Sequence, residues 1–571
     1  MNRRRSFRRL AALSTAALIV LSVAVPGVSA DPPAGGPAEQ KAKTTKIQIL
    51  SLNDFHGQLR PPDETSSGGR IGAGLPAGGS EYLASYVRNL RATNPNTLFV
   101  SAGDLIGATP LVSAIFHDEP TIEAMNLIGL DYNGVGNHEF DEGAAELTRM
   151  QEGGCHPVEG CFAGDGFDGA DFPFLAANVT YKATGDTIFP PYAIHEFPGV
   201  DIAVVGMTLE GTPGIVTAAA TADIDFHDEA DTVNALVPEL KAQGIETIIV
   251  LLHEGGTSPA ITAANINACD GVGGTAITDV MTRLDREIDL VITGHTNWAV
   301  NCPNFAGTGI RLTGAASVGR LVTDTDLVVS RATKDVISAT INNVIVRRDA
   351  LPKAPDLTAL IDKYGTIAAP TENRVIGTAS AALTRTQNGV GESSLGDIIA
   401  DAQLWATSGP SWPAANGAPA VISFMNSGGI RADINSGPIT YGEAFSVQPF
   451  ANVLVTMDMT GAQIDALLEQ QFTGGNGILQ IPASLTYDRY PATAAPDRVR
   501  NIRIGGVALV PGTTYRVTVN NFLADGGDGY STFTGGTNRY VGEIDLDAFA
   551  RYVQSLGTVN PGPQNRITLV P

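Results

Sequence analysis

Five hydrophobic runs in the first 300 residues of the 571-residue chain are each closely followed by a side chain that can bind a metal ion. Each of these side chains stands next to a glycine or close to one, and glycine lets the backbone turn sharply where a strand ends. Asp, His and Asn supply the oxygen and nitrogen ligands that suit Zn, Mn or a similar divalent ion. The five segments are Asn53–Gly57, Gly103–Asp104, Gly136–Glu139, His253–Gly256 and Gly294–Asn297.

The order of these segments predicts that they meet at one site. In a layered α/β fold the carboxyl ends of the strands lie along one edge, where ligands bind. Asp54 and His56 are two residues apart on a chain that leaves a strand, so both can reach the same ion. Two ions about 3.5–4 Å apart can hold a phosphate and activate a water that bridges them. Asp104 is the carboxylate best placed to bridge the two ions.

Each segment taken alone also has an ordinary structural explanation. An Asp-x-His pair is common in turns, Gly-Asn-His-Glu is compatible with a turn that caps a helix, and His253 could be a core histidine. The series favours a metal site because all five segments come in order, each after a hydrophobic run.

Strand-like and helix-like segments alternate from Lys46 to residue 346, which predicts a layered α/β domain. Helix-like segments are Glu81–Arg91 and Thr121–Ile128. The expected strands are Ile47–Leu52, Leu98–Ser101, Tyr132–Val135, Phe174–Ala176, Ile202–Val205, Thr247–Leu252, Leu290–Thr293 and Arg311–Thr313.

The alternation breaks at residues 347–372, where prolines flank a short amphipathic stretch at Asp356–Tyr364. This pattern is typical of a linker between domains that contains a helix. We therefore expect a second, smaller α/β domain over residues 373–571, with a first helix at Ser394–Trp405. Its expected strands are Val421–Met425, Val453–Met457, Val499–Ile504 and Tyr515–Val519.

The first thirty residues have the pattern of a secretory signal peptide. Five arginines precede the uncharged apolar run Leu10–Val25, and Val28-Ser29-Ala30 resembles a cleavage site. An uncleaved anchor and a twin-arginine signal at Arg4-Arg5 are the alternatives. Residues 31–45 are predicted to form a flexible leader. The expected mature protein is secreted, with no stable membrane span.

Composition and charge limit the partners of the chain. The formal net charge is −23, and it becomes −28 once residues 1–30 and their five arginines are removed. Binding to nucleic acid through a basic surface needs clustered Lys and Arg, so this charge argues against it. An anionic substrate would depend on bound cations that reverse the local field.

The four cysteines predict two disulfides, because export implies an oxidising compartment. Cys155 and Cys161 are close in sequence and are expected to close one loop, which leaves Cys269 to pair with Cys302. The spacing does not fit a structural zinc site.

The series of five segments resembles the calcineurin-like metallophosphoesterase domain of the 5'-nucleotidase family, and the likeness extends over nearly the whole mature chain. The resemblance implies a four-layer catalytic domain and two divalent metal ions, Zn, Mn or similar. It implies that His138 contacts the phosphate and that Asp141 orients His138. It also implies one ion on Asp54, His56 and Asn297, the other on Asn137, His253 and His295, and Asp104 between them. The family usually has Gln or His where this chain has Asn297.

The second domain carries segments similar to those that bind nucleotides in this family. Asn426-Ser427-Gly428-Gly429-Ile430-Arg431 resembles the family pattern Asn-x-Gly-Gly-x-Arg, in which Arg431 would bind phosphate. Phe450 and Phe522 would stack on the base, and Asp528 would accept hydrogen bonds from the ribose. Without the resemblance, these residues fit a glycine-rich turn and two core phenylalanines.

The activity that the resemblance implies is hydrolysis of nucleoside 5'-monophosphates such as AMP, by attack of a hydroxide held by the two metals. UDP-sugar hydrolysis and 2',3'-cyclic-nucleotide phosphodiesterase activity are the alternatives, and a non-catalytic nucleotide-binding surface protein is a more remote one. The sequence leaves open the native metals, the preferred base and the oligomeric state.

Overall fold

A computed structural model describes residues 43–570, except 63–68, 73, 163, 165, 218, 257, 260, 410–411, 413–416, 473–476 and 492–496. The predicted signal peptide and nearly all of the predicted leader lie outside the described residues. The first strand, β1 (Thr44–Leu52), includes the last two residues assigned to that leader. From Thr44 onward the chain forms one compact unit.

Two six-stranded sheets form the centre of the first half of the chain. The first sheet has the order β16-β15-β1-β4-β5-β6, and the second has the order β13-β14-β12-β11-β9-β8. The strands of the first sheet are β1, β4 (Thr97–Ser101), β5 (Tyr132–Gly134), β6 (Phe174–Leu175), β15 (Leu321–Ser330) and β16 (Val336–Ile345). Those of the second are β8 (Tyr192–Phe197), β9 (Val200–Thr208), β11 (Thr247–His253), β12 (Ile288–Thr293), β13 (Ala299–Cys302) and β14 (Arg311–Ala315).

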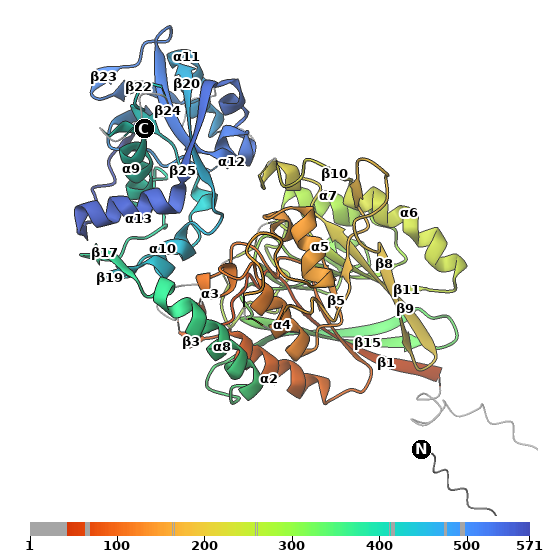
Figure 1. The fold of residues 1–571 in the computed structure, drawn as a ribbon. Helices are drawn as coiled ribbons and strands as arrows, with labels where there is room; N and C mark the ends of the chain where they lie inside the picture. The colour runs from red at the N-terminus through yellow and green to blue at the C-terminus, as the bar shows by residue number, and fades with distance from the viewer. Residues whose placement is uncertain are drawn as a thin grey trace, which may run out of the picture. The chain divides into compact units, whose positions relative to one another are not determined.

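Helices cover the outer faces of both sheets, which gives the expected four layers. Figure 1 shows α2 (Ser80–Arg91), α4 (Glu119–Ile128) and α8 (Pro355–Glu372) beyond the first sheet. It shows α6 (Glu229–Ala242) and α7 (Thr275–Arg283) beyond the second sheet. One apolar cluster joins α2, α4 and α8 to the first sheet, and another joins α6 and α7 to the second.

A third apolar cluster lies between the two sheets, so their strands are buried on both faces. Ile49 of β1 and Leu98 of β4 pack in it with Ile249 of β11. Leu50, the next residue of β1, packs in the outer cluster under the helices. Strands buried on both faces read as continuous runs of apolar residues, which is why the sequence revealed them.

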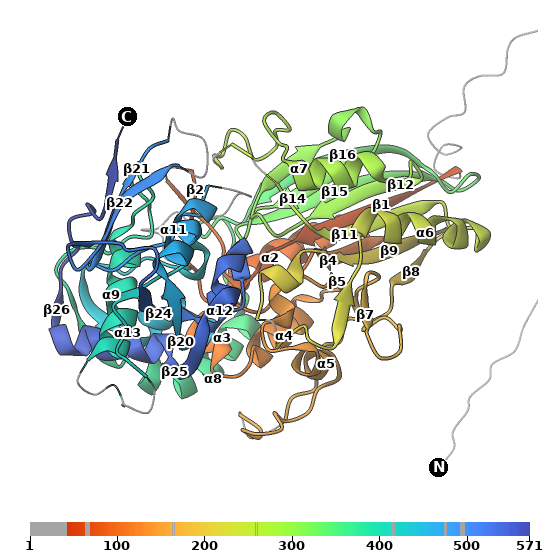
Figure 2. The same cartoon turned by 90° about the horizontal axis from the view of Figure 1, so that it is seen from above.

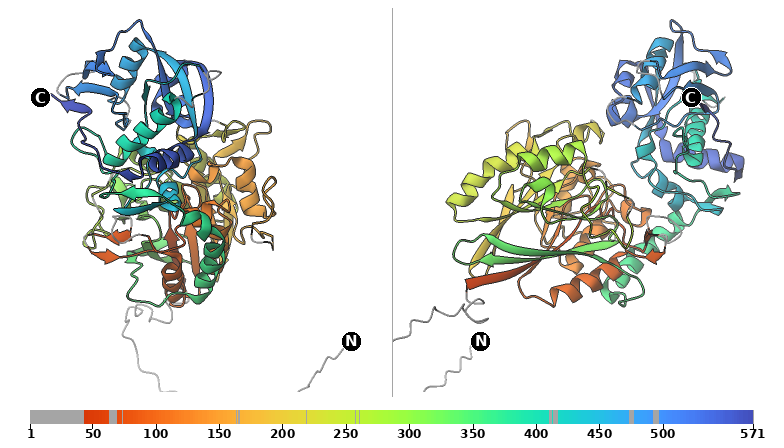
Figure 3. Two further views of the ribbon diagram at one scale, coloured as in Figure 1. Left: turned by 60° about the vertical axis from the view of Figure 1, so that its left-hand side comes forward. Right: turned by 180° about the vertical axis from the view of Figure 1, so that it is seen from behind.

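The antiparallel strands β15 and β16 extend the first sheet at one edge, and β15 pairs with β1 over Thr44–Ser51. The right-hand view of Figure 3 shows this green hairpin beside the red strand β1. Neither strand was predicted from the sequence. Most of β16 is only partly buried or exposed, so it has no continuous apolar run.

The helix of the predicted linker, α8, is longer than expected and continues through Pro370 to Glu372. A proline inside a helix loses one backbone hydrogen bond. Leu357, Tyr364 and Ala368 are fully buried in the outer cluster of the first sheet, and this packing stabilises the helix beyond Tyr364.

The last 200 residues form three small sheets with helices packed on them. One of them is the four-stranded sheet β18-β24-β20-β25, and Figure 2 shows α9 and α13 beside it. Ser393 caps α9 by accepting a hydrogen bond from the Gly396 amide. The elements are α9 (Ser394–Ser408), β18 (Ile422–Ser423), β20 (Val453–Thr460), β24 (Thr514–Asn520), β25 (Thr537–Ile544) and α13 (Asp545–Leu556).

Both predicted disulfides are present, between Cys155 and Cys161 and between Cys269 and Cys302. None of the helices in the described part of the chain is long and apolar enough to cross a bilayer.

Candidate metal centre

The five polar segments converge, but they come from two sheets instead of one edge of a single sheet. Three of them follow β1, β4 and β5 of the first sheet, and two follow β11 and β12 of the second. The sheets pack face to face, so strand ends from both layers reach the same place. A sequence that shows only the order of strands does not reveal how they divide between layers.

Asp54, His56 and Asp104 form the first group of possible ligands. One ligating atom of each lies within 4.8 Å of the others. His56 Nε2 is 3.9 Å from Asp54 Oδ1 and 3.8 Å from Asp104 Oδ2. Asp54 and Asp104 are almost completely buried, and Asp54 Oδ1 has no hydrogen-bond partner among the described residues. A buried carboxylate oxygen without a donor fits a bound cation, which would offset its desolvation.

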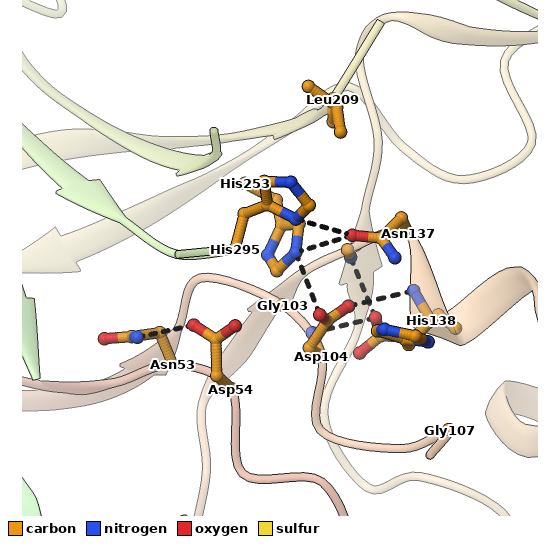
Figure 4. Close-up of polar contacts among 12 residues, drawn as sticks. Asn53, Asp54, Gly103, Asp104, Gly107, Asn137, His138, Leu209, His253 and His295 are labelled. Carbon is orange, nitrogen blue, oxygen red and sulfur yellow. Dashed lines mark hydrogen bonds and ion pairs between the residues drawn. The ribbon is translucent and has the colours of Figure 1, made fainter. Parts of the chain in front are cut away.

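Asp104, Asn137, His253 and His295 form the second group, shown in Figure 4. His253 Nε2 lies 3.1 Å from Asp104 Oδ2 and 3.1 Å from Asn137 Oδ1. His295 Nδ1 lies 3.0 Å from the same amide oxygen. Asp104 therefore belongs to both groups. A carboxylate shared in this way is suited to a pair of cations.

Backbone carbonyls orient two of the imidazoles. His253 Nδ1 is 2.7 Å from the carbonyl oxygen of Ala102, and His56 Nδ1 is 2.9 Å from that of Gly107. A carbonyl only accepts, so each Nδ1 carries a proton. In the neutral imidazole Nε2 then has the lone pair, and it faces the carboxylates, as in histidines that bind metals.

The backbone is left-handed at most of the predicted ligands. The angle φ is 50° at Asp54, 48° at His56, 54° at Asp104 and 69° at His295. Residues other than glycine seldom adopt this conformation, because Cβ crowds the backbone. Strained residues of this kind cluster at functional sites, where the surrounding structure holds them in place.

Two glycines of the segments allow the strand ends to approach each other closely. A Cβ atom on Gly136 would lie 2.3 Å from Asp104 Oδ1, and one on Gly103 would lie 2.7 Å from His253 Nδ1. Both distances are shorter than any real contact. The close packing of the ligands therefore requires glycine at both positions. In the sequence, the only sign of this requirement is that each glycine directly precedes a predicted ligand.

Burial and mutual charge strongly perturb the group. Burial raises the pKa of Asp54 to about 7, and it lowers the pKa of His56 and of His295 to about 3. Burial alone would lower the pKa of His253, but the carboxylate of Asp104 outweighs it and raises this pKa to about 10. Perturbed titratable groups in one buried cluster are typical of a functional site.

His138 and Asp141 form the predicted pair beside this cluster. His138 Nδ1 is 2.9 Å from Asp141 Oδ2, and the His138 amide donates to Asp104 Oδ1 at 2.9 Å. Burial lowers the pKa of His138, but the carboxylates of Asp141 and Asp104 outweigh this effect and raise it. The charge of Asp141 thus favours the imidazolium form of His138.

Two residues of the motifs have structural roles that the sequence analysis did not assign. Glu139 accepts hydrogen bonds from the amides of Asp104, Leu105 and Gly136, so its carboxylate ties two strand ends together. The buried side chain of Asn53 donates to Asp54 Oδ2 at 2.6 Å and accepts from the Ala315 amide. Asn53 directly precedes the predicted ligand Asp54, and Glu139 directly follows His138; this adjacency was the only available signal.

Asn297 is the one predicted metal ligand for which the structure shows no contact with the other ligands' side chains. Its amide lies 3.4 Å from the carbonyl oxygen of His295, and its φ is 61°. It therefore shares the left-handed backbone of the cluster, while its assignment to the first metal remains a prediction.

The predicted nucleotide-binding residues form a connected set. Asn426 donates to Asp528 Oδ2 at 2.8 Å. The Arg431 guanidinium lies 5.7 Å from the centre of the Phe450 ring, and that ring stacks on the imidazole of His138 at 5.6 Å. Burial lowers the pKa of Arg431, as does Arg385, while the carboxylates of Asp104 and Asp141 act in the opposite direction. Phe522 packs closely on Gly527, since a Cβ atom on that glycine would lie 2.5 Å from the Phe522 ring.

Two family models match the chain. Residues 47–298 match calcineurin-like phosphoesterase, and residues 375–535 match the 5'-nucleotidase C-terminal domain. The endonuclease YhcR of Bacillus subtilis is 32% identical over 89% of this chain, which spans 40% of that relative's length.

Two further relatives match most of the chain. The cell wall protein Lmo0130 of Listeria monocytogenes is 31% identical over 95% of this chain and 71% of its own length. The crystal structure of a 5'-nucleotidase precursor from Thermus thermophilus matches with a TM-score of 0.73 and 26% identity. That match covers 92% of this chain and 99% of the other.

Proposed function

Because the chain belongs to the 5'-nucleotidase family of metallophosphoesterases and is a phosphoric ester hydrolase, we propose that it hydrolyses nucleoside 5'-monophosphates such as AMP. The products are the nucleoside and phosphate. The observation that carries this proposal is the position of Asp104, whose carboxylate belongs to two adjoining groups of possible metal ligands.

Two divalent ions are proposed, and the donor set fits Zn, Mn or a similar ion. Asp54, His56 and Asn297 would hold one ion, Asn137, His253 and His295 the other, and Asp104 both. When bound, such ions withdraw charge from a phosphate and make a nearby water more acidic. The unpaired Oδ1 of Asp54 and the two carbonyl-oriented imidazoles support this assignment.

His138 and Arg431 would act on the phosphate itself. His138 Nδ1 is held by Asp141, so its Nε2 is left to donate a hydrogen bond to a phosphate oxygen. Arg431 has a planar set of donors that matches two phosphate oxygens. Its charge interacts with Asp104, Asp54 and Asp141, which supports a position near the reacting phosphate.

Phe450, Phe522, Asn426 and Asp528 would bind the nucleoside. Asp528 receives one hydrogen bond, from Asn426, at Oδ2, and its other oxygen would accept from a ribose hydroxyl. Phe450 already stacks on His138, so a base that stacks on Phe450 has to replace that contact or use the ring's other face. A movement of the second domain, with residues 347–372 as the linker between domains at 46–346 and 373–571, would provide this change.

Export to the outside of the cytoplasm is part of the proposal. Two disulfides suit an oxidising compartment, and a relative that matches 95% of this chain is called a cell wall protein. Residues 1–30 would act as the signal peptide.

A substrate panel tests the proposal. The purified protein, freed of metal and reloaded with Mn²⁺ or Zn²⁺, is assayed with AMP, UDP-glucose, 2',3'-cyclic AMP and single-stranded RNA. The last substrate is included because one relative is called an endonuclease. We expect the highest kcat/KM for AMP and at least a roughly 10³-fold loss in Asp104→Asn. The variant Asp171→Asn, which changes an exposed carboxylate, is the matched control.

Each other outcome identifies an alternative. Preference for UDP-glucose, the cyclic nucleotide or the RNA would replace the AMP assignment with the corresponding activity. Binding of AMP without phosphate release at saturating metal would contradict the enzymatic proposal and favour a nucleotide-binding protein.

A further inference from the structure

A second cluster of imidazoles and carboxylates lies outside the proposed phosphoesterase centre and shares no residue with it. His117 lies between α3 (Leu111–Ala114) and α4, and His156 belongs to the loop closed by the Cys155–Cys161 disulfide. The two rings are stacked, with centroids 4.1 Å apart and an interplanar angle of 7°. Ligating atoms of His117, His156 and Glu159 all lie within 4.8 Å of one another.

The disulfide loop holds two of these groups in place. His156 and Gly160 form a short antiparallel bridge, with backbone hydrogen bonds of 3.1 and 2.9 Å in the two directions. The amide of Glu159 donates to His156 Nδ1 at 3.1 Å, so this nitrogen keeps a lone pair. A cation that binds this nitrogen has to replace the hydrogen bond from the Glu159 amide.

His117 is oriented as a metal-binding histidine is. Its Nδ1 lies 2.5 Å from Glu142 Oε2, and its Nε2 lies 3.7 Å from Glu159 Oε1. A carboxylate on one imidazole nitrogen fixes the tautomer that leaves the other nitrogen free to bind an ion. Zinc lies about 2.0–2.2 Å from nitrogen and oxygen ligands, so two ligands of a tetrahedral ion are about 3.4 Å apart. The observed 3.7 Å separation is close to that value.

We propose that His117, His156 and Glu159 bind a Zn²⁺ ion, or a similar transition metal, at a site separate from the phosphoesterase centre. Two imidazoles and one carboxylate are a frequent donor set for zinc, and water would complete the tetrahedron. For both lone pairs to point at one ion, the two rings have to tilt out of their parallel stack. His156 is only partly buried, so this rotation meets little packing.

Such an ion would tie the disulfide loop to the segment between α3 and α4. That segment supports the phosphoesterase centre, because Asp118 accepts a hydrogen bond from the Gly107 amide and the Gly107 carbonyl holds His56. Glu142 also directly follows Asp141. The ion therefore stabilises the surroundings of the centre without contacting its ligands.

Zinc content tests the proposal. Metal-free protein is equilibrated with Zn²⁺ alone, dialysed and analysed for bound zinc per chain. We expect His156→Asn and Glu159→Gln each to bind one zinc fewer than the natural chain. Glu152→Gln changes an exposed carboxylate near the loop and serves as the control, with no loss expected. Glu159 is exposed, so its variant reports even if His156→Asn fails to fold.

The test also separates this site from the phosphoesterase centre. In an Asp104→Asn background, the additional substitution Glu159→Gln should still remove one zinc per chain. With excess Mn²⁺, Glu159→Gln should keep the natural rate of AMP hydrolysis if the chain has that activity. An unchanged zinc content in both His156→Asn and Glu159→Gln would overturn the proposal and identify the cluster as ordinary ion pairs.

Discussion

Replacing Asp141 by Asn tests whether the carboxylate acts through His138. The change keeps the shape of the side chain but removes the charge that faces His138 Nδ1 at 2.9 Å. The two side chains are only 12% and 20% exposed, so solvent screens the pair weakly. A hydrogen bond between charged groups contributes roughly 1.5–3 kcal/mol. Since about 1.4 kcal/mol corresponds to tenfold in rate, we expect kcat for AMP to fall by about 10- to 150-fold.

The assay is steady-state phosphate release at saturating Mn²⁺, with kcat and KM determined separately. The charge of Asp141 is expected to matter in the transition state, so kcat should change more than KM. A double-mutant cycle adds His138→Asn alone and together with Asp141→Asn. If Asp141 acts only by orienting and charging His138, the double variant should be no slower than His138→Asn.

Two results would refute this reasoning. One is a natural kcat in Asp141→Asn, which would mean that the charge does not assist the reaction. The other is a further loss, tenfold or more, when Asp141→Asn is added to His138→Asn. Asp171→Asn again controls for the loss of one negative charge.

Three further predictions concern the fold and the centre. Burial raises the pKa of Asp545 to about 7, so its contribution to stability is lost as the pH rises from about 4 to 7. The free energy of unfolding of Asp545→Asn, relative to that of the natural chain, should therefore rise by about 2–3 kcal/mol from pH 5 to pH 8, as measured by urea unfolding. A difference between the two proteins that is the same at both pH values would contradict this. Gly136→Ala places a Cβ atom against Asp104 Oδ1, so the amount of bound metal and the rate of AMP hydrolysis should fall together. Full retention of both would show that the strand ends can move apart. Replacing both residues of the Cys269–Cys302 disulfide by Ser should cost about 3–4 kcal/mol, because it closes a 33-residue loop, and an unchanged thermal midpoint would exclude that effect.

The candidate metal-binding segments could be predicted from the sequence because strands buried on both faces leave continuous apolar runs. Each of the five runs is a strand, and each is followed by the expected ligand. Asp54, Asp104 and His253 were found in this way, since a polar residue at a buried strand end is conspicuous. Both disulfides were predicted because four cysteines in a chain with a predicted signal peptide leave few pairings.

The arrangement in layers could not be predicted from the same pattern. Whether β11 belongs with β1 or in a second sheet depends on pairing between distant segments, which apolar runs do not encode. The partly exposed strand β16 was not predicted because it has no such run. The role of Glu139 depends on which backbone amides meet its carboxylate, and only the folded chain brings them together.

The contacts of Phe450 were also beyond the sequence. Its aromatic ring suggested a surface for a base, and the structure adds its stacking on His138. That contact depends on the packing of segments that lie far apart in the chain, for which local patterns carry no information.

The most direct test of the central claim is anomalous diffraction at the manganese absorption edge, from crystals of the protein grown with Mn²⁺. Our account predicts two strong peaks, one on each side of the Asp104 carboxylate, with His56 and His253 as ligands to different ions. Absence of any peak within bonding distance of Asp104 would contradict it.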